Sequence, residues 1–96
     1  MSLSEPPFWI NKINSFVVKE DFHEVQTRIL DFLNQCQECE SVNYEQNRIV
    51  VQTKNLETHI YFYTKNGIVV FVNDYKCKTE ELDNIVLYLE LRKLFN

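Results

Sequence analysis

Cys36 and Cys39 are separated by two residues, a spacing found in redox pairs and in halves of zinc sites. A redox pair of the thioredoxin kind lies at a helix N-terminus, where the helix dipole lowers the thiol pKa. The apolar periodicity before Cys36 places this pair at the end of a helix instead, where the dipole disfavours a thiolate. We therefore predict that Cys36 continues the core face of that helix and that Cys39 lies in the following turn.

A zinc site would need further ligands beyond this pair, and the chain offers few of them. The residues of suitable type are Cys77, His59 and His23, which are scattered and form no second closely spaced pair. We therefore expect no metal and no cofactor.

Other groups capable of catalysis also lack a recognisable context. His23 and His59 have no nearby Ser or Cys in a known nucleophile pattern. The acidic cluster Glu80, Glu81 and Asp83 is explained by its place in the first turn of a helix, where the dipole favours negative charge. A single glycine cannot form a phosphate-binding loop. We predict no catalytic residue and a protein that is not an enzyme.

Composition indicates one folded domain with an acidic balance. The chain has 96 residues, of which 45% are hydrophobic, and carries a net charge of −4. This apolar share is enough for a small core and excludes general disorder. Nucleic acids and anionic membranes attract basic patches, so we expect neither as a partner. The start lacks a secretory leader pattern, and three cysteines cannot all pair within the chain, so we expect a cytoplasmic, intracellular protein.

The first fifteen residues read as an arm, and residues 16–96 as a single domain. Pro6 and Pro7 prevent a long helix, while Phe8, Trp9 and Ile10 form an apolar cluster that needs cover. The very beginning has the character of a cloning remnant, so part of the arm is expected to be foreign to the natural chain. Residues 16–18 either form a short strand or lead into the first helix.

Apolar residues at intervals of three and four predict a first helix over residues 22–35. Asp21 followed by Glu24 resembles a helix N-cap with its capping-box partner. Four strands then follow over residues 41–44, 48–53, 59–63 and 68–72. The clearest signal separates the last two strands, because Asn66-Gly67 supplies the positive φ angles of a type I′ hairpin turn.

Residues 79–95 contain no Gly or Pro and predict a last helix that begins at Thr79. Its apolar residues fall on two nearly opposite faces. We expect the first face to cover the sheet; its members are Leu82, Ile85, Val86 and Leu89. We expect the second face to be an interface; its members are Leu87, Leu91 and Leu94, flanked by Tyr88 and Phe95.

This order predicts an α+β two-layer sandwich: a four-stranded antiparallel meander with an N-terminal and a C-terminal helix on one face. Alternation along the third strand then turns Tyr61 and Tyr63 to the open face. Two explanations of that apolar surface remain: the arm with Trp9 folds across it, or it is a second interface.

These features favour a non-enzymatic adaptor or regulatory domain for protein-protein interaction. We expect it to associate with itself, as a homodimer, through the C-terminal helix, the open sheet face or both. The expected interface consists of Leu87, Tyr88, Leu91, Leu94, Phe95, Tyr61, Tyr63 and Trp9. The alternative is a lipid- or RNA-binding module that uses the aromatic sheet face.

Overall fold

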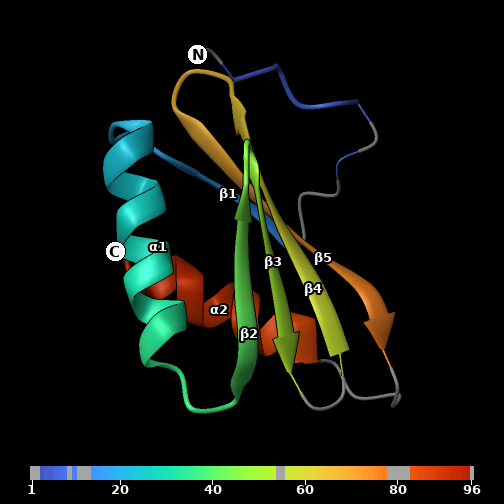
Figure 1. Ribbon diagram of the computed structural model, residues 1–96. Helices are drawn as coiled ribbons and strands as arrows, with labels where there is room; N and C mark the ends of the chain where they lie inside the picture. Colours follow the sequence, from blue (N-terminus) through green and yellow to red (C-terminus); the bar gives the residue numbers. More distant parts are fainter. Residues whose placement is uncertain (1–2, 9, 11–13, 54–55, 78–82, 96) are drawn as a thin grey trace.

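The computed structural model describes residues 3–8, 10, 14–53, 56–77 and 83–95. These residues form an α+β fold with an antiparallel sheet and two helices, as the sequence predicts. The elements are β1 (Ser15–Val18), α1 (Phe22–Gln35), β2 (Cys39–Glu45), β3 (Arg48–Thr53), β4 (Leu56–Thr64), β5 (Ile68–Cys77) and α2 (Asp83–Lys93). Both helices lie on one side of the sheet, and the N-terminal arm lies toward the other side (Figure 1).

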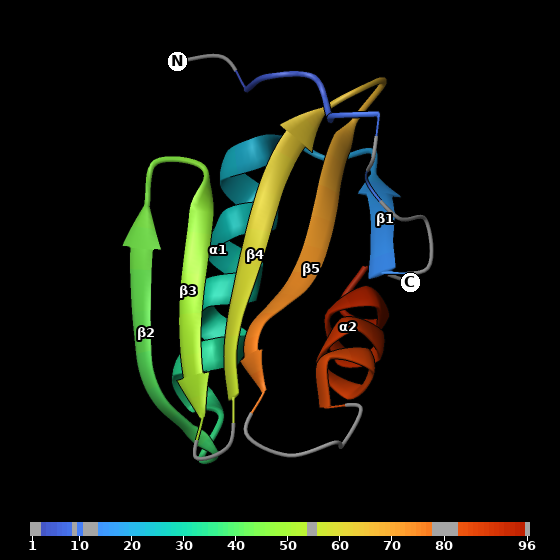
Figure 2. The same ribbon diagram turned by 90° about the vertical axis from the view of Figure 1, so that its right-hand side faces the viewer.

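The sheet has five strands in the order β1-β5-β4-β3-β2, one more than the predicted meander. The additional strand is β1, in which Ser15 pairs with Phe71 and Val18 pairs with Ile68. β1 and β2 therefore form the two edges of the sheet, and α2 lies beside the β1 edge (Figure 2). Of the two interpretations of residues 16–18, the strand is correct.

Helix α1 has the predicted bounds, Phe22–Gln35. Asp21 occupies the N-cap position, but its side chain makes no cap hydrogen bond, so only the position of the expected capping box is confirmed. The helix buries Val25, Ile29 and Leu33 completely or nearly so against the sheet. This spacing of four residues is the periodicity that predicted the helix.

The β4–β5 hairpin has the predicted positive φ angles, 55° at Asn66 and 137° at Gly67. Thr64 pairs with Ile68, so Lys65, Asn66 and Gly67 form a three-residue loop in place of the predicted two-residue type I′ turn. A Cβ on Gly67 would lie 2.8 Å from the carbonyl oxygen of Val18. The loop therefore needs glycine both for its backbone angle and for its close contact with β1.

The core lies between the helices and the inner face of the sheet. Alternate residues of the central strands point inward, as the two-residue period of a strand requires. The strand residues in this core are Val18, Ile49, Val51, Ile60, Phe62, Ile68, Val70 and Val72. Phe22 of α1 contacts Phe62 edge-on, with ring centroids 5.5 Å apart.

The prediction for the two faces of the last helix is wrong. Leu91, assigned to an exposed interface, is fully buried in the core, and Tyr88 beside it is only 7% exposed. Leu89, assigned to the sheet-facing side, is 46% exposed. Leu82 and the side chains of Ile85 and Val86 lie outside the described part of the structure, so their placement stays a prediction. The physical reason is β1: its Phe16 packs against Tyr88 and Phe95, so the second apolar face has a partner within the chain.

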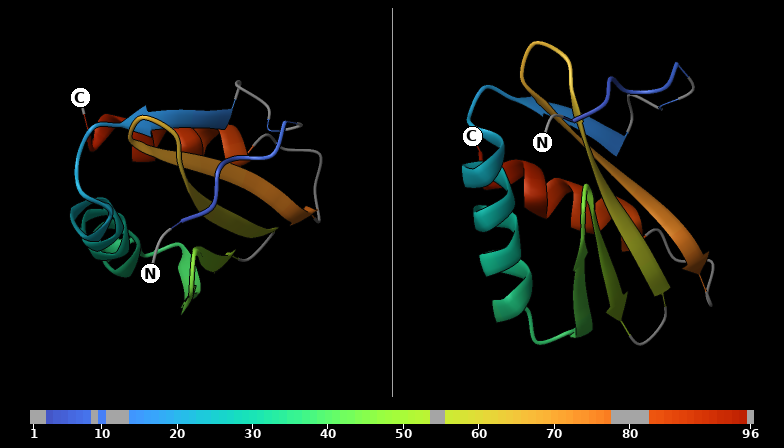
Figure 3. Two further views of the ribbon diagram at one scale, coloured as in Figure 1. Left: turned by 90° about the horizontal axis from the view of Figure 1, so that it is seen from above. Right: turned by 45° about the horizontal axis from the view of Figure 1, so that its top comes forward.

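The N-terminal arm crosses the end of the sheet at the β4–β5 hairpin (Figure 3). Its contact there is a hydrogen bond from the Thr64 amide to the carbonyl oxygen of Ser4. Phe8 is 99% exposed, whereas Leu3 packs against the core. Trp9 lies outside the described residues. Among the described residues, no helix is long and apolar enough to cross a membrane.

Candidate binding surfaces

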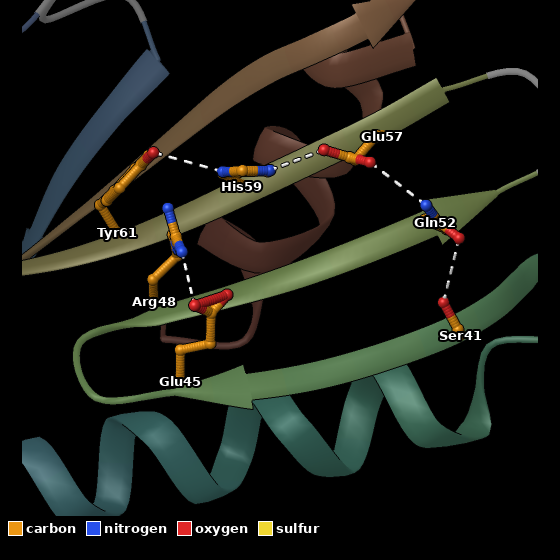
Figure 4. Close-up of polar contacts among 7 residues, drawn as sticks. All are labelled: Ser41, Glu45, Arg48, Gln52, Glu57, His59 and Tyr61. Atoms are coloured by element: carbon orange, nitrogen blue, oxygen red, sulfur yellow. Dashed lines mark hydrogen bonds and ion pairs between the residues drawn. The ribbon is translucent and has the colours of Figure 1, made fainter.

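The outer face of the sheet carries a polar network that joins β2, β3 and β4 (Figure 4). The Ser41 hydroxyl donates to the Gln52 side-chain oxygen at 3.4 Å, and the Gln52 amide donates to Glu57 at 3.2 Å. Neighbouring residues on the same strands add an ion pair between Arg48 and Glu45. These bonds hold three adjacent strands together on the face that the helices do not cover.

His59 is the centre of this network and is only 7% exposed. Its Nε2 lies 2.9 Å from Glu57 Oε2, and its Nδ1 lies 3.3 Å from the Tyr61 hydroxyl oxygen. An ionised carboxylate only accepts hydrogen bonds, so Nε2 carries a proton and donates to Glu57, while Nδ1 is within hydrogen-bond distance of the Tyr61 hydroxyl. Both ring nitrogens are thus engaged, and the arrangement fixes the position of the Tyr61 hydroxyl.

Tyr61 and Tyr63 lie on the outer face, as predicted, and each is partly buried. Their rings stack at 6.3 Å with an interplanar angle of 17°, and Tyr61 also lies 6.1 Å from Phe71. Burial, with a smaller contribution from Tyr61, raises the pKa of Tyr63. The Arg48 guanidinium is 5.8 Å from the Tyr61 ring centroid. The Arg48 guanidinium therefore covers one face of the Tyr61 ring.

A second surface is a groove between the edge strand β1 and helix α2. It has a volume of about 570 Å³. One side is formed by residues 15–20, and the other by Tyr88, Arg92 and Phe95. Tyr88 and Arg92 are spaced i, i+4 on one face of α2, and Phe95 follows in the turn after the helix ends at Lys93. The groove therefore runs along a strand edge with a helix face opposite.

The backbone of β1 points into this groove at alternate residues. On the β5 side, the carbonyl oxygen of Val72 accepts a hydrogen bond of 2.6 Å from the Asn14 side chain. Backbone groups alternate in direction along β5, so the N–H and C=O groups of Val70 and Ile68 also point toward β1. Their β1 partners are Phe16 and Val18. Ser15 and Val17 consequently present their backbone groups to the open edge. The Tyr88 hydroxyl, which donates to the Ser15 carbonyl oxygen at 3.4 Å, lies on that open side.

Aromatic rings and cations surround the groove. Phe16 lies between Tyr88 and Phe95, with ring centroids 5.8 and 6.1 Å away. The carboxylate of Glu20 is paired with Arg28 at 3.1 Å. Lys19 and Arg92 are both exposed. The rim therefore has more positive than negative charge, in a chain whose net charge is −4.

The cysteine pair lies at the end of α1, as the sequence predicts. Cys36 is the C-cap residue, and Cys39 begins β2 instead of lying in the turn before it. Burial, together with a hydrogen bond and charge repulsion from Cys36, raises the pKa of Cys39 to about 12. Within the described part of the chain no three His, Cys, Asp or Glu side chains are grouped to hold a metal ion. Absence of a metal stays a prediction.

The structure separates the residues expected to form one interface. Leu87, Leu94 and Phe95 are partly buried and pack against the core, whereas Tyr61 and Tyr63 lie on the opposite face of the sheet. The sequence analysis missed the edge of β1, with Ser15 and Val17, and the role of Arg92 beside it. The alternation of Phe16 and Val18 inward with Val17 outward was the available signal, but four residues are too few to distinguish a strand from a connection.

Comparisons of the chain with protein-family models, with curated proteins and with solved structures found no match.

Proposed function

We propose that this domain is a non-enzymatic protein-interaction adaptor that binds an extended segment of a partner protein along β1, in the groove formed with α2. The observation that carries the proposal is the outward-facing backbone of Ser15 and Val17 in that groove. An extended peptide can pair with such an edge as an additional strand and place alternate side chains against the neighbouring helix.

The other edge of the sheet is less suited to this role. β2 is interrupted by a register shift between Cys39 and Ser41, and it carries exposed charged residues such as Glu45. Bulges and charges on an edge strand discourage pairing with another chain. β1 instead exposes Val17, which is 52% accessible, beside a groove that contains the Phe16, Tyr88 and Phe95 rings.

The outer sheet face supports the alternative lipid- or RNA-binding role less well. Its tyrosine rings stack on one another and on Arg48, and its polar groups bond among themselves. A self-associating adaptor that pairs two copies of β1 would bring to Arg92 no groove acid other than Glu20, which is already paired with Arg28. A foreign segment with an acid of its own therefore fits Arg92 better than a second copy does.

The test is selection of a phage-displayed random peptide library against three proteins: wild type, Val17→Pro and Val17→Thr. Proline removes the outward N–H and is tolerated on an edge strand, whereas threonine keeps both the N–H and the β-branched shape. We expect wild type and Val17→Thr to enrich the same peptides and Val17→Pro, with an unchanged melting temperature, to lose them. Enrichment that survives Val17→Pro, or no enrichment by wild type, would contradict strand addition.

Light scattering across a concentration series examines self-association in the same samples. We expect a monomer whose mass does not depend on Val17. A homodimer that Val17→Pro dissociates would show that the occupant of the groove is a second copy.

A further inference from the structure

The groove beside β1 has a chemical preference that its lining residues define. We infer that the bound segment carries an acidic side chain, facing Arg92, two positions from an apolar side chain that packs on Phe16 and Phe95. This inference rests on the proposed strand addition, and it adds the chemistry of the partner.

The preference for an apolar side chain follows from the aromatic rings on the floor of the groove. Phe16, Tyr88 and Phe95 form a continuous aromatic surface, in which Phe16 contacts both helix residues. Tyr88 is 7% exposed and its hydroxyl is already bonded to the Ser15 carbonyl, so it offers mainly ring carbon to a ligand. An aliphatic or aromatic side chain placed there would exclude water from the exposed ring surface.

The preference for an acidic side chain follows from how the charged groups around the groove are paired. Both nitrogens of the Arg28 guanidinium contact the carboxylate of Glu20, at 3.1 and 3.4 Å, so this acid does not neutralise Arg92. Arg92 contacts only a neutral group in the described structure, the Tyr88 hydroxyl at 3.4 Å. A guanidinium in that setting gains a charge-assisted hydrogen bond from an incoming carboxylate.

The spacing of the two groups matches an extended chain. Along α2, Tyr88 and Arg92 are separated by about 6 Å, from a rise of about 1.5 Å per residue. Same-face neighbours in a strand lie about 6.6 Å apart. One side chain of the bound segment that faces the groove can therefore contact the aromatic rings. The next side chain on the same face, two residues away, can then contact Arg92.

The position of Arg92 indicates an internal side chain as the source of the carboxylate. Arg92 lies between Tyr88 and Phe95 along the chain, all three line the groove, and the groove continues along residues 15–20 on the strand side. A chain terminus would more naturally lie at one end of the groove. The segment therefore runs through the groove, and its acid is Asp or Glu within the sequence.

The experiment uses synthetic versions of the peptides that wild type enriches, with blocked termini, in a fluorescence-anisotropy binding assay. Each acidic peptide is compared with its Glu→Gln or Asp→Asn form, against wild type, Arg92→Gln and Lys93→Gln. Lys93 is the matched control, because it is a neighbouring cation of α2 that does not line the groove and pairs with Glu90 at 3.4 Å. Melting temperatures establish that each variant is folded.

We expect Arg92→Gln to weaken binding of the acidic peptide about three- to fivefold, the size of an exposed ion pair, and to leave the amide peptide unchanged. Lys93→Gln should bind both peptides like wild type. We further expect Arg92→Glu to favour the peptide with lysine in place of its acid.

Three outcomes overturn the inference. Enriched peptides that depend on the Val17 N–H but show no acidic preference would remove the acidic partner and leave strand addition intact. Peptides that require a free terminal carboxylate would assign the charge recognition to a chain end. Failure of wild type to enrich any peptide removes both the proposed function and this inference.

Discussion

At the scale of single residues, Gly67 holds the β4–β5 loop at a φ of 137° and lies against β1. Its backbone angle is readable locally, because Asn-Gly between two β-forming runs identifies a positive φ position without tertiary information. Its contact with the Val18 carbonyl could not be predicted, since it requires knowing that β1 pairs with β5. The position of Cys36 at a helix end was likewise predictable, whereas the burial that raises the Cys39 pKa was not.

Replacing Gly67 with valine should destabilise the protein by about 1 kcal/mol or more, because a β-branched residue resists positive φ. The added Cβ would also displace the Val18 backbone, since the two would lie 2.8 Å apart. Urea denaturation monitored by circular dichroism measures this. Asn66→Gly is the control, because it suits a φ of 55° and adds no atoms. Equal midpoints for wild type and Gly67→Val would contradict the described loop.

Cys39 should react slowly with thiol reagents at neutral pH. With a pKa of about 12, Cys39 has a far smaller thiolate fraction at neutral pH than an ordinary cysteine, whose pKa is about 8.5. We expect alkylation by iodoacetamide to be roughly a thousandfold slower than for an ordinary thiol, and to accelerate as pH rises toward the pKa. Peptide mass spectrometry of native and urea-unfolded protein follows this residue directly. Equal rates in the two states would show that folding does not protect the thiol.

At the scale of elements, the last helix shows where periodicity fails. Both faces of α2 are apolar, so spacing alone could not decide which one packs on the sheet. The decision is made by β1, whose Phe16 covers Tyr88 and Phe95. Because β1 was not firmly predicted as a strand, the helix face that it covers was mistaken for a partner surface. By contrast, α1 has one apolar face and was placed correctly.

Leu91→Ala tests the corrected orientation of α2. Leu91 is fully buried, so truncation should reduce the free energy of unfolding by about 2–5 kcal/mol. Leu89→Ala, at a position that is 46% exposed, should cost less than about 1 kcal/mol. Chemical denaturation of both variants gives the comparison. A larger loss at Leu89 than at Leu91 would restore the original assignment of the two faces.

At the scale of the whole molecule, the sequence was sufficient for the fold class but not for the binding surface. The Cα radius of gyration is 12.6 Å, about the value expected for a single domain of this length. The fold class depends on the order of strongly patterned elements, which is readable along the chain. The groove depends on β1 and α2, which are separated by more than 60 residues and meet only after folding. A surface that joins such distant segments leaves no local pattern.

Amide hydrogen exchange of the domain, with and without a peptide enriched by wild type, tests strand addition most directly. A sixth strand would take up the outward N–H of Val17, so exchange of this amide should slow by at least about tenfold, while the edge-facing amide of Tyr44 in β2 stays unchanged. Phe16, whose N–H already faces β5, provides an internal reference. Protection that appears along β2 or across the outer sheet face, with none at Val17, would contradict a binding groove between β1 and α2.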